Sequence, residues 1–223
     1  SLTTSDGIQL AATFYPVGAA SPPGLVLAHM QGTDRRSWDV FARRAQGVGY
    51  ACIAFDLRGH GESGLIGPTA RSYRTFTAED WRGVYADIDA ARQALLDRGV
   101  NARNLVLMGA SLSASLVLEY AVKHSDIPAV IMISPLLDYK GIKADDALTA
   151  LGERPELLMS AEGDSYSATT CTTLKRMAPG FCEQRTYQGA AHGTALFDTS
   201  TNAMEQVFLW LAPIVGAQRP ATE

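Results

Sequence analysis

Short runs of consecutive apolar residues recur along the chain, and they alternate with longer segments whose apolar residues repeat every three or four positions. The runs indicate strands buried on both faces, and the second spacing indicates helices with one apolar face. Strands are predicted over residues 25–28, 51–55, 105–108, 129–133, 156–160 and 184–187. This alternation predicts an α/β protein with a mostly parallel sheet and helices on both faces.

Other segments complete this pattern. Residues 7–14 alternate between apolar and polar, which predicts a half-buried antiparallel strand at the sheet edge. Thr77 and Asp80 resemble a capping box that opens a long helix ending at Gly99. Residues 134–155 are expected to form a mostly polar excursion. Further helices are predicted over residues 38–45, 112–122, 169–177 and 203–211.

Length and composition limit the possible classes of protein. The chain has 223 residues, of which 47% are hydrophobic and 19% charged, and we predict a single α/β domain over residues 1–223. The net charge of −4 and the absence of a basic cluster speak against a nucleic-acid partner. Because no apolar run is long enough to cross a bilayer, no transmembrane segment is expected. The oligomeric state is left open.

The three cysteines leave the cellular compartment open. Cys52 lies in a predicted strand and is expected to be a buried thiol. Cys171 and Cys182 would pair in an exported protein, and would otherwise remain reduced. The chain begins at Ser1 without methionine. A cytoplasmic protein and an exported protein whose signal peptide has been removed both fit, and the exported protein is favoured. No spacing of cysteine and histidine predicts a metal site.

A serine lies where the strand over residues 105–108 gives way to a helix. The segment Gly109-Ala110-Ser111-Leu112-Ser113 has the form of a G-x-S-x-G nucleophile elbow, except that serine replaces the second glycine. Small neighbours leave room for a strained backbone at Ser111, and the Leu112 amide at the helix start favours negative charge. A plain turn between strand and helix can have the same short sequence, so the motif alone does not establish chemistry.

An acid and a base follow later strands of the predicted sheet. A serine hydroxyl needs a base to become nucleophilic, and an imidazole base needs a carboxylate to orient it. Asp164 and His192 each follow a strand, in the chain order Ser…Asp…His of α/β-hydrolases. Because the carboxyl ends of parallel strands share one edge, we expect Ser111, Asp164 and His192 to converge there. Glu162 and Asp138 compete with Asp164 as the acid.

The other three histidines have simpler explanations. His29 ends a strand and is expected to bond the backbone, and His60 lies among glycines in a turn and is expected to be structural. His124 lies near a helix C-terminus, where it would be a solvated complement to the helix dipole. His192, on a glycine-flanked loop, is therefore the predicted base.

An oxyanion on the substrate needs two rigid main-chain donors. The first is the Leu112 amide at the elbow. The second is expected from the loop that follows His29, where Gln31 is preferred and Met30 is the alternative. An ordinary loop between a strand and a helix would also explain this segment.

Four segments resemble the α/β-hydrolase superfamily, and the likeness runs along the whole chain. They are residues 29–32, with Met30 where glycine is usual in the oxyanion loop, the D-x-R-G-H-G-x-S turn at 56–63, the elbow at 109–113 and the histidine loop at 191–193. Within the superfamily the chain is most similar to small, lidless, dienelactone-hydrolase-like proteins of bacteria, also at residues 134–141. Dienelactone hydrolases use a cysteine nucleophile, so their lactone substrate is not carried over. The resemblance implies ester hydrolysis through an acyl-enzyme, without a metal or organic cofactor.

The segment between the fourth and fifth buried strands bears on substrate size. Only about twenty residues follow Ile133 before the next strand, which leaves little room for a cap domain. We therefore expect an open, shallow cleft and small or short-chain carboxylic esters as substrates. A peptidase or acyltransferase using the same side chains, and a non-catalytic binding protein on a hydrolase scaffold, are the alternatives.

Overall fold

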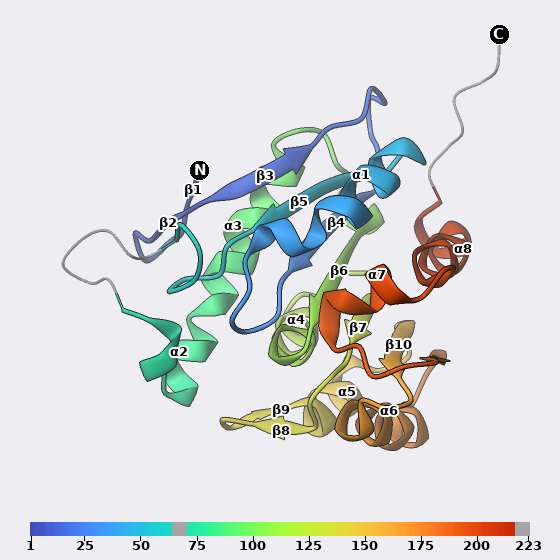
Figure 1. Ribbon diagram of the computed structural model, residues 1–223. Helices are drawn as coiled ribbons and strands as arrows, with labels where there is room; N and C mark the ends of the chain where they lie inside the picture. Colours follow the sequence, from blue (N-terminus) through green and yellow to red (C-terminus); the bar gives the residue numbers. More distant parts are fainter. Residues whose placement is uncertain (64–70, 217–223) are drawn as a thin grey trace, which may run out of the picture.

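The computed structural model describes residues 1–63 and 71–216, and its centre is a mixed sheet of strand order β11-β10-β7-β6-β4-β5-β3 (Figure 1). All neighbouring strands in this sheet are parallel except β3 and β5. The strands are β3 (Ala12–Tyr15), β4 (Gly24–Ala28), β5 (Ala51–Phe55), β6 (Leu105–Ala110), β7 (Val130–Ile133), β10 (Glu156–Ala161) and β11 (Cys182–Tyr187). The predicted parallel sheet with an antiparallel edge strand is confirmed. Residues 64–70 and 217–223 of the predicted domain lie outside the described residues.

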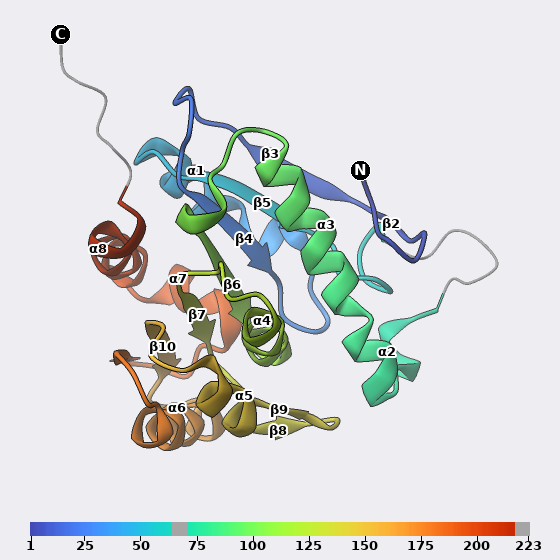
Figure 2. The same cartoon turned by 180° about the vertical axis from the view of Figure 1, so that it is seen from behind.

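Helices cover both faces of the sheet, as predicted. Figure 1 shows the face that carries α1 (Asp39–Gly47), α7 (Leu196–Thr199) and α8 (Ala203–Val215). Figure 2 shows the other face, with α3 (Val84–Leu96), α4 (Leu112–Lys123), α5 (Ala144–Leu151) and α6 (Ser165–Met177). Among the described helices, none combines the length and the apolar character that crossing a bilayer requires. Short 3₁₀ helices span Arg35–Trp38, Tyr73–Thr75, Ala102–Asn104 and Gly193–Ala195.

The continuous apolar runs follow from this two-sided cover. Every residue of β6 is buried, and successive side chains of a strand point to opposite faces. Leu105 and Leu107 therefore join the core beneath α3 and α4, whereas Val106 and Met108 join the core beneath α1 and α8. The central strands β4, β5, β6, β7 and β10 are therefore sealed from water on both faces.

The long helix predicted from Thr77 to Gly99 is wrong in its length. Thr77 and Asp80 do form the capping box, but it caps the short α2 (Ala78–Arg82), and α3 starts after Gly83 and ends at Leu96. A Cβ atom at position 83 would lie 2.6 Å from Nη1 of Arg58. The interruption between α2 and α3 therefore falls at a glycine beside the Arg58 guanidinium.

The segment over residues 134–155, predicted as a mostly polar excursion, contains regular structure that the sequence analysis did not assign. It holds a hairpin of β8 (Asp138–Tyr139) and β9 (Ile142–Lys143), followed by α5. The buried residues of α5 have helical spacing, and α5 packs on α4 and α6; they are Ala144, Ala147, Leu148 and Leu151. Because α5 is part of the layer that covers the sheet, the described residues of this segment form no separate cap domain.

The predicted strand over residues 7–14 splits at Ala11. Its first part, β2 (Gln9–Leu10), pairs with β1 (Leu2–Thr3), and only β3 joins the main sheet. The Ala11 amide instead donates to Oγ of Ser63 at 2.9 Å, so the chain changes partners at this residue.

All three cysteines are free and buried. The prediction for Cys52 is confirmed, and of the two alternatives for Cys171 and Cys182 the structure shows unpaired thiols. Burial raises the pKa of both Cys171 and Cys182 to about 12, so these thiols are neutral at physiological pH.

Candidate active site

Ser111 lies on a sharp bend between β6 and α4. Its backbone has φ +56° and ψ −126°, a conformation that residues other than glycine rarely adopt. Gly109 makes this bend possible, because a Cβ atom there would lie 2.3 Å from the carbonyl oxygen of Ser113. The Ser111 amide donates to the carbonyl of Ile133 at 2.8 Å, which ties the bend to the end of β7.

The structure brings Ser111, His192 and Asp164 together. His192 follows β11, and its Nε2 lies 2.8 Å from Oγ of Ser111. Asp164 follows β10, and its Oδ2 lies 2.7 Å from Nδ1 of His192. The competing acids, Glu162 and Asp138, are both exposed, and the carboxylate that meets His192 belongs to Asp164.

The surroundings of Asp164 keep it ionised. Burial raises its pKa, but the contributions that lower it, of which the hydrogen bond from His192 is the largest, outweigh burial, and the pKa is lowered. A carboxylate only accepts hydrogen bonds, so Nδ1 of His192 must donate to it and Nε2 is left to accept from the Ser111 hydroxyl. The His192 side chain is 40% exposed, so this pair of side chains can be reached from solvent.

The loop after β4 is fixed by hydrogen bonds to one carbonyl. The Met30 oxygen accepts from the Thr33 amide at 3.2 Å, from the Thr33 hydroxyl at 2.9 Å and from Nδ1 of His29 at 2.8 Å. The described residues contain no cis peptide bond, and in a trans peptide the N–H points opposite to the carbonyl. The Gln31 amide therefore points away from Thr33 and His29. At the elbow, Leu112 is the first residue of α4, so its amide has no acceptor within the helix.

Ser113 has a contact that the sequence did not reveal. It replaces the second glycine of the elbow motif, is 1% exposed, and its hydroxyl donates to the carbonyl of His29 at 2.6 Å. The substitution therefore links the elbow to the loop that carries Gln31. No sequence signal could have found this link, because the two residues are 84 positions apart.

The remaining histidines do not take part in this cluster. His29 is fully buried, and its Nε2 accepts from the Leu57 amide at 3.0 Å, which confirms the expected backbone contacts. His60 stacks on Tyr73 with ring centroids 3.9 Å apart, and burial lowers its pKa to about 4, so it is a neutral packing residue as predicted. His124 caps the end of α4, but its ring stacks on Tyr120 instead of being fully solvated.

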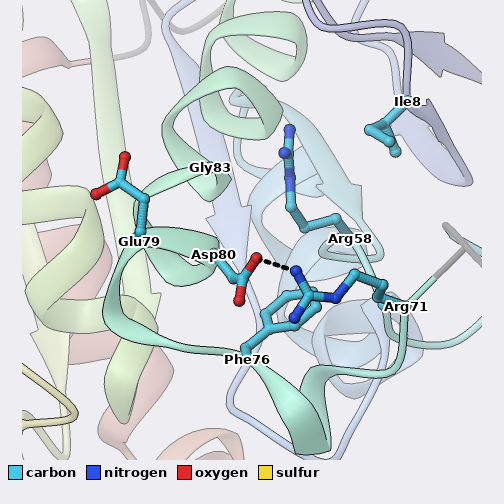
Figure 3. Close-up of a pocket in the computed structure, with 8 residues that line it drawn as sticks. Ile8, Arg58, Arg71, Phe76, Glu79, Asp80 and Gly83 are labelled. Carbon is cyan, nitrogen blue, oxygen red and sulfur yellow. Dashed lines mark hydrogen bonds and ion pairs between the residues drawn. The ribbon is translucent and has the colours of Figure 1, made fainter. Parts of the chain in front are cut away.

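A pocket of about 250 Å³ lies elsewhere, between the turn after β5 and α2 (Figure 3). Its two arginines already have acidic partners: Arg58 meets Asp6 and the buried Asp87, and Arg71 meets Asp80. Neither the serine nor the histidine of the elbow cluster lines this pocket. Among residues 1–63 and 71–216, no group of three or more histidine, cysteine or acidic side chains could hold a metal ion.

Comparison with known proteins places the chain in a family. Residues 25–221 match the Alpha/beta hydrolase family. The quorum-quenching protein AidA of Acinetobacter baumannii (strain MDR-ZJ06) is 32% identical over 136 residues, a match that covers 60% of this chain and only 42% of that protein.

Among the solved structures that share the fold are two hydrolases. The α/β hydrolase GrgF from Penicillium sp. sh18 has a TM-score of 0.79 at 14% identity over 96% of each chain. An esterase from Pyrococcus furiosus has a TM-score of 0.74 at 16% identity, over 96% of this chain and 89% of the esterase. The chain belongs to the alpha/beta hydrolase family.

Proposed function

We propose that the protein is a serine hydrolase that cleaves small or short-chain carboxylic esters through an acyl-enzyme, and that it acts as a single α/β domain. The observation that carries this proposal is the hydrogen-bonded series from the Ser111 hydroxyl through His192 to Asp164, at 2.8 and 2.7 Å. Membership of a hydrolase family and the fold shared with an esterase support it.

The proposed reaction has two steps. In the first, Ser111 Oγ attacks the ester carbonyl while His192 takes its proton, and the carbon–oxygen bond to the alcohol breaks as His192 returns that proton to the leaving alcohol. In the second, His192 takes a proton from water as the water oxygen attacks the acyl carbon, and the bond to Ser111 Oγ breaks as His192 returns the proton to that oxygen, which releases the acid. Asp164 remains a carboxylate throughout and stabilises the charged imidazole.

The loop geometry favours Gln31 over Met30 as the second oxyanion donor. The His29 carbonyl points towards Ser113 in the first turn of α4, so the Met30 amide, on the same trans peptide, points away from that helix. The Gln31 amide is free of this restriction and points away from the donors that hold the Met30 carbonyl. We therefore assign the oxyanion site to the amides of Leu112 and Gln31.

Two features support a small ester as the substrate. Residues 134–155 form a hairpin and a covering helix instead of a cap domain, so nothing in this segment provides a large closed acyl pocket. The His192 side chain is 40% exposed, which fits direct access from solvent. The relative from Acinetobacter baumannii is named for quorum quenching, and that name describes the relative alone. Turnover assays on a panel of esters would identify the substrate of this chain.

A fluorophosphonate probe tests the proposal. It should label the wild-type protein at Ser111, located by mass spectrometry, and labelling should be lost in Ser111→Ala and in His192→Ala. Ser115→Ala is the matched control, because Ser115 lies on the same helix but donates its hydroxyl to the Leu136 carbonyl at 2.9 Å. This control should be labelled and should turn over activated short-chain esters like the wild type.

The substrate panel separates the alternatives. Turnover of esters without turnover of matched amides supports an esterase, and faster transfer to an added alcohol than to water indicates an acyltransferase. If the wild type shows neither labelling nor turnover, the protein is a binding protein on a hydrolase scaffold and the proposal is wrong.

A further inference from the structure

Ile133 and Ser134, at the end of β7, contact the segments that carry all three side chains of the proposed site. The Ile133 carbonyl accepts from the Ser111 amide at 2.8 Å, and the Ser134 amide donates to the Met159 carbonyl on β10 at 2.7 Å. The Ser134 hydroxyl accepts from the Gly193 amide at 2.9 Å. One short segment therefore fixes the elbow, the strand that leads to Asp164, and the residue after His192.

Ser134 is an unusual residue for this position. Its φ is +48°, in the left-handed region that favours glycine, and it is fully buried. A glycine would meet the backbone requirement without strain, so the serine must supply something that glycine lacks. What it supplies is the hydroxyl, which the Gly193 amide uses as its acceptor.

The Ser134 hydroxyl has one more bonding capacity, its own proton. A hydroxyl can accept and donate at once, so after accepting from Gly193 it can still donate to Asp164. Burial raises the pKa of Asp164, the hydrogen bond from His192 at 2.7 Å lowers it most, and Ser134 lowers it further. The same hydroxyl therefore accepts from the loop of the base and still has its own proton available for the acid.

We propose that Ser134 is a positioning residue for ester hydrolysis, whose hydroxyl holds the histidine loop against Asp164 by accepting from Gly193 and donating to the carboxylate. This inference rests on the proposed function of Ser111, His192 and Asp164. Ser134 acts through the loop and the acid, and it takes no part in bond making.

Two variants separate the hydroxyl from the backbone. Ser134→Ala removes the hydroxyl and keeps a Cβ atom at positive φ, whereas Ser134→Gly removes the hydroxyl and relieves the strain. Both should lower kcat by about 10- to 100-fold, with KM within about twofold of the wild type, because a small displacement of a catalytic group weakens the chemical step more than binding. A residue that mattered only for the turn would show no loss in either variant, because alanine keeps the wild-type Cβ atom and glycine relieves the strain.

The pH profile provides a second readout. The titratable groups that face Asp164 are His192 from the histidine loop and Cys171 from α6, and burial raises the pKa of Cys171 to about 12, so this thiol stays neutral. A carboxylate that loses a hydrogen-bond donor is more basic. The acid limb of kcat/KM should therefore move to higher pH in both Ser134 variants and stay in place in Ser115→Ala.

The outcomes distinguish this inference from the proposed function. If the wild type and Ser115→Ala hydrolyse esters, and both Ser134 variants match them in kcat and in acid limb, Ser134 has no positioning role and the proposed function stands. If the wild type is not labelled at Ser111, both proposals fail. A downfield proton resonance of His192 Nδ1–H, present in the wild type and shifted or broadened in folded Ser134→Gly, would support the inference without any activity measurement; an unchanged resonance would contradict it.

Discussion

The two ends of strand β10 carry carboxyl groups with opposite properties. Asp164, beyond the C-terminal end, has a lowered pKa, whereas burial raises the pKa of Glu156, the first residue of the strand, to about 8. Neither carboxylate oxygen of Glu156 has a hydrogen-bond partner among the described residues. Asp164, by contrast, bonds His192 at 2.7 Å. The partly exposed carboxyl group that has a donor therefore stays ionised at neutral pH, whereas the fully buried one without a donor does not.

This difference has a functional meaning. A carboxylate that must stabilise an imidazolium has to be charged before the reaction starts, and Asp164 meets that requirement. Glu156 is neutral at neutral pH and fully buried, so it can only affect stability. Changes at the two ends of β10 should accordingly separate activity from stability.

Asp164→Asn should have the largest effect. An asparagine cannot stabilise the imidazolium and favours the wrong tautomer of His192, so kcat should fall by about 1,000- to 10,000-fold. Steady-state hydrolysis of an activated ester measures this loss. The matched control is Asp138→Asn, which changes an exposed acid that competed with Asp164 in the sequence. Equal losses in both variants would contradict the assignment of Asp164.

Glu156→Gln should change stability and leave kcat unaltered. The folded-state pKa of Glu156 is about 8, above its ordinary value of 4.5, so its favourable contribution is present below pH 4.5 and is lost as the pH rises to 8. Over this window the wild type should lose on the order of 4 kcal/mol in its free energy of unfolding from this group.

The glutamine variant cannot ionise, so urea unfolding at several pH values should show a flatter dependence between pH 5 and 8. Asp164 supplies the internal comparison, because its lowered pKa gives the opposite sign: its contribution is present at neutral pH and is lost as the pH falls. A parallel pH dependence in wild type and Glu156→Gln would show that Glu156 is ionised in the folded protein.

Ser113→Ala should have a smaller effect, because it tests the hydrogen bond between the elbow and the loop after β4. It removes the donor to the buried His29 carbonyl, a hydrogen bond worth about 1 kcal/mol, and frees the loop that carries Gln31. We expect kcat to fall by about three- to tenfold. Ser113→Gly, which restores the usual residue of the motif, should show the same loss. Wild-type kcat in both variants would mean that this link does not position the oxyanion loop.

The parts of the fold that the sequence predicted well are those governed by local pattern. The strand over residues 51–55 matches β5, and the elbow was recognised because a buried strand, small residues and a helical repeat adjoin within one segment. The helix α5 was missed because Asp145 and Asp146 at its start made a helical segment look like a polar loop. The interruption at Gly83 was missed because the apolar residues keep their helical spacing on both sides of it.

The same division applies to the site. Ser111, Asp164 and His192 could be proposed because each follows a strand, and the topology of a parallel sheet brings strand ends together. Ser113 and Ser134 could not be, since their roles depend on contacts to His29 and Gly193 across 84 and 59 residues. A serine in a loop carries no sign of its distant partner.

The two thiols near β10 should show the smallest effect. Burial is the main cause that raises the pKa of each thiol to about 12, and the negative charge of Asp164 adds to it at Cys171, as that of Glu156 does at Cys182. A thiol reagent should therefore react with neither residue in the native protein, and with both after unfolding in urea. Peptide mapping without reductant should find no Cys171–Cys182 link. Rapid reaction of Cys182 alone in the native protein would show that the Glu156 end of the strand opens to solvent. The two ends of β10 would then differ in mobility, and the lack of donors would not explain the difference between the two carboxyl groups.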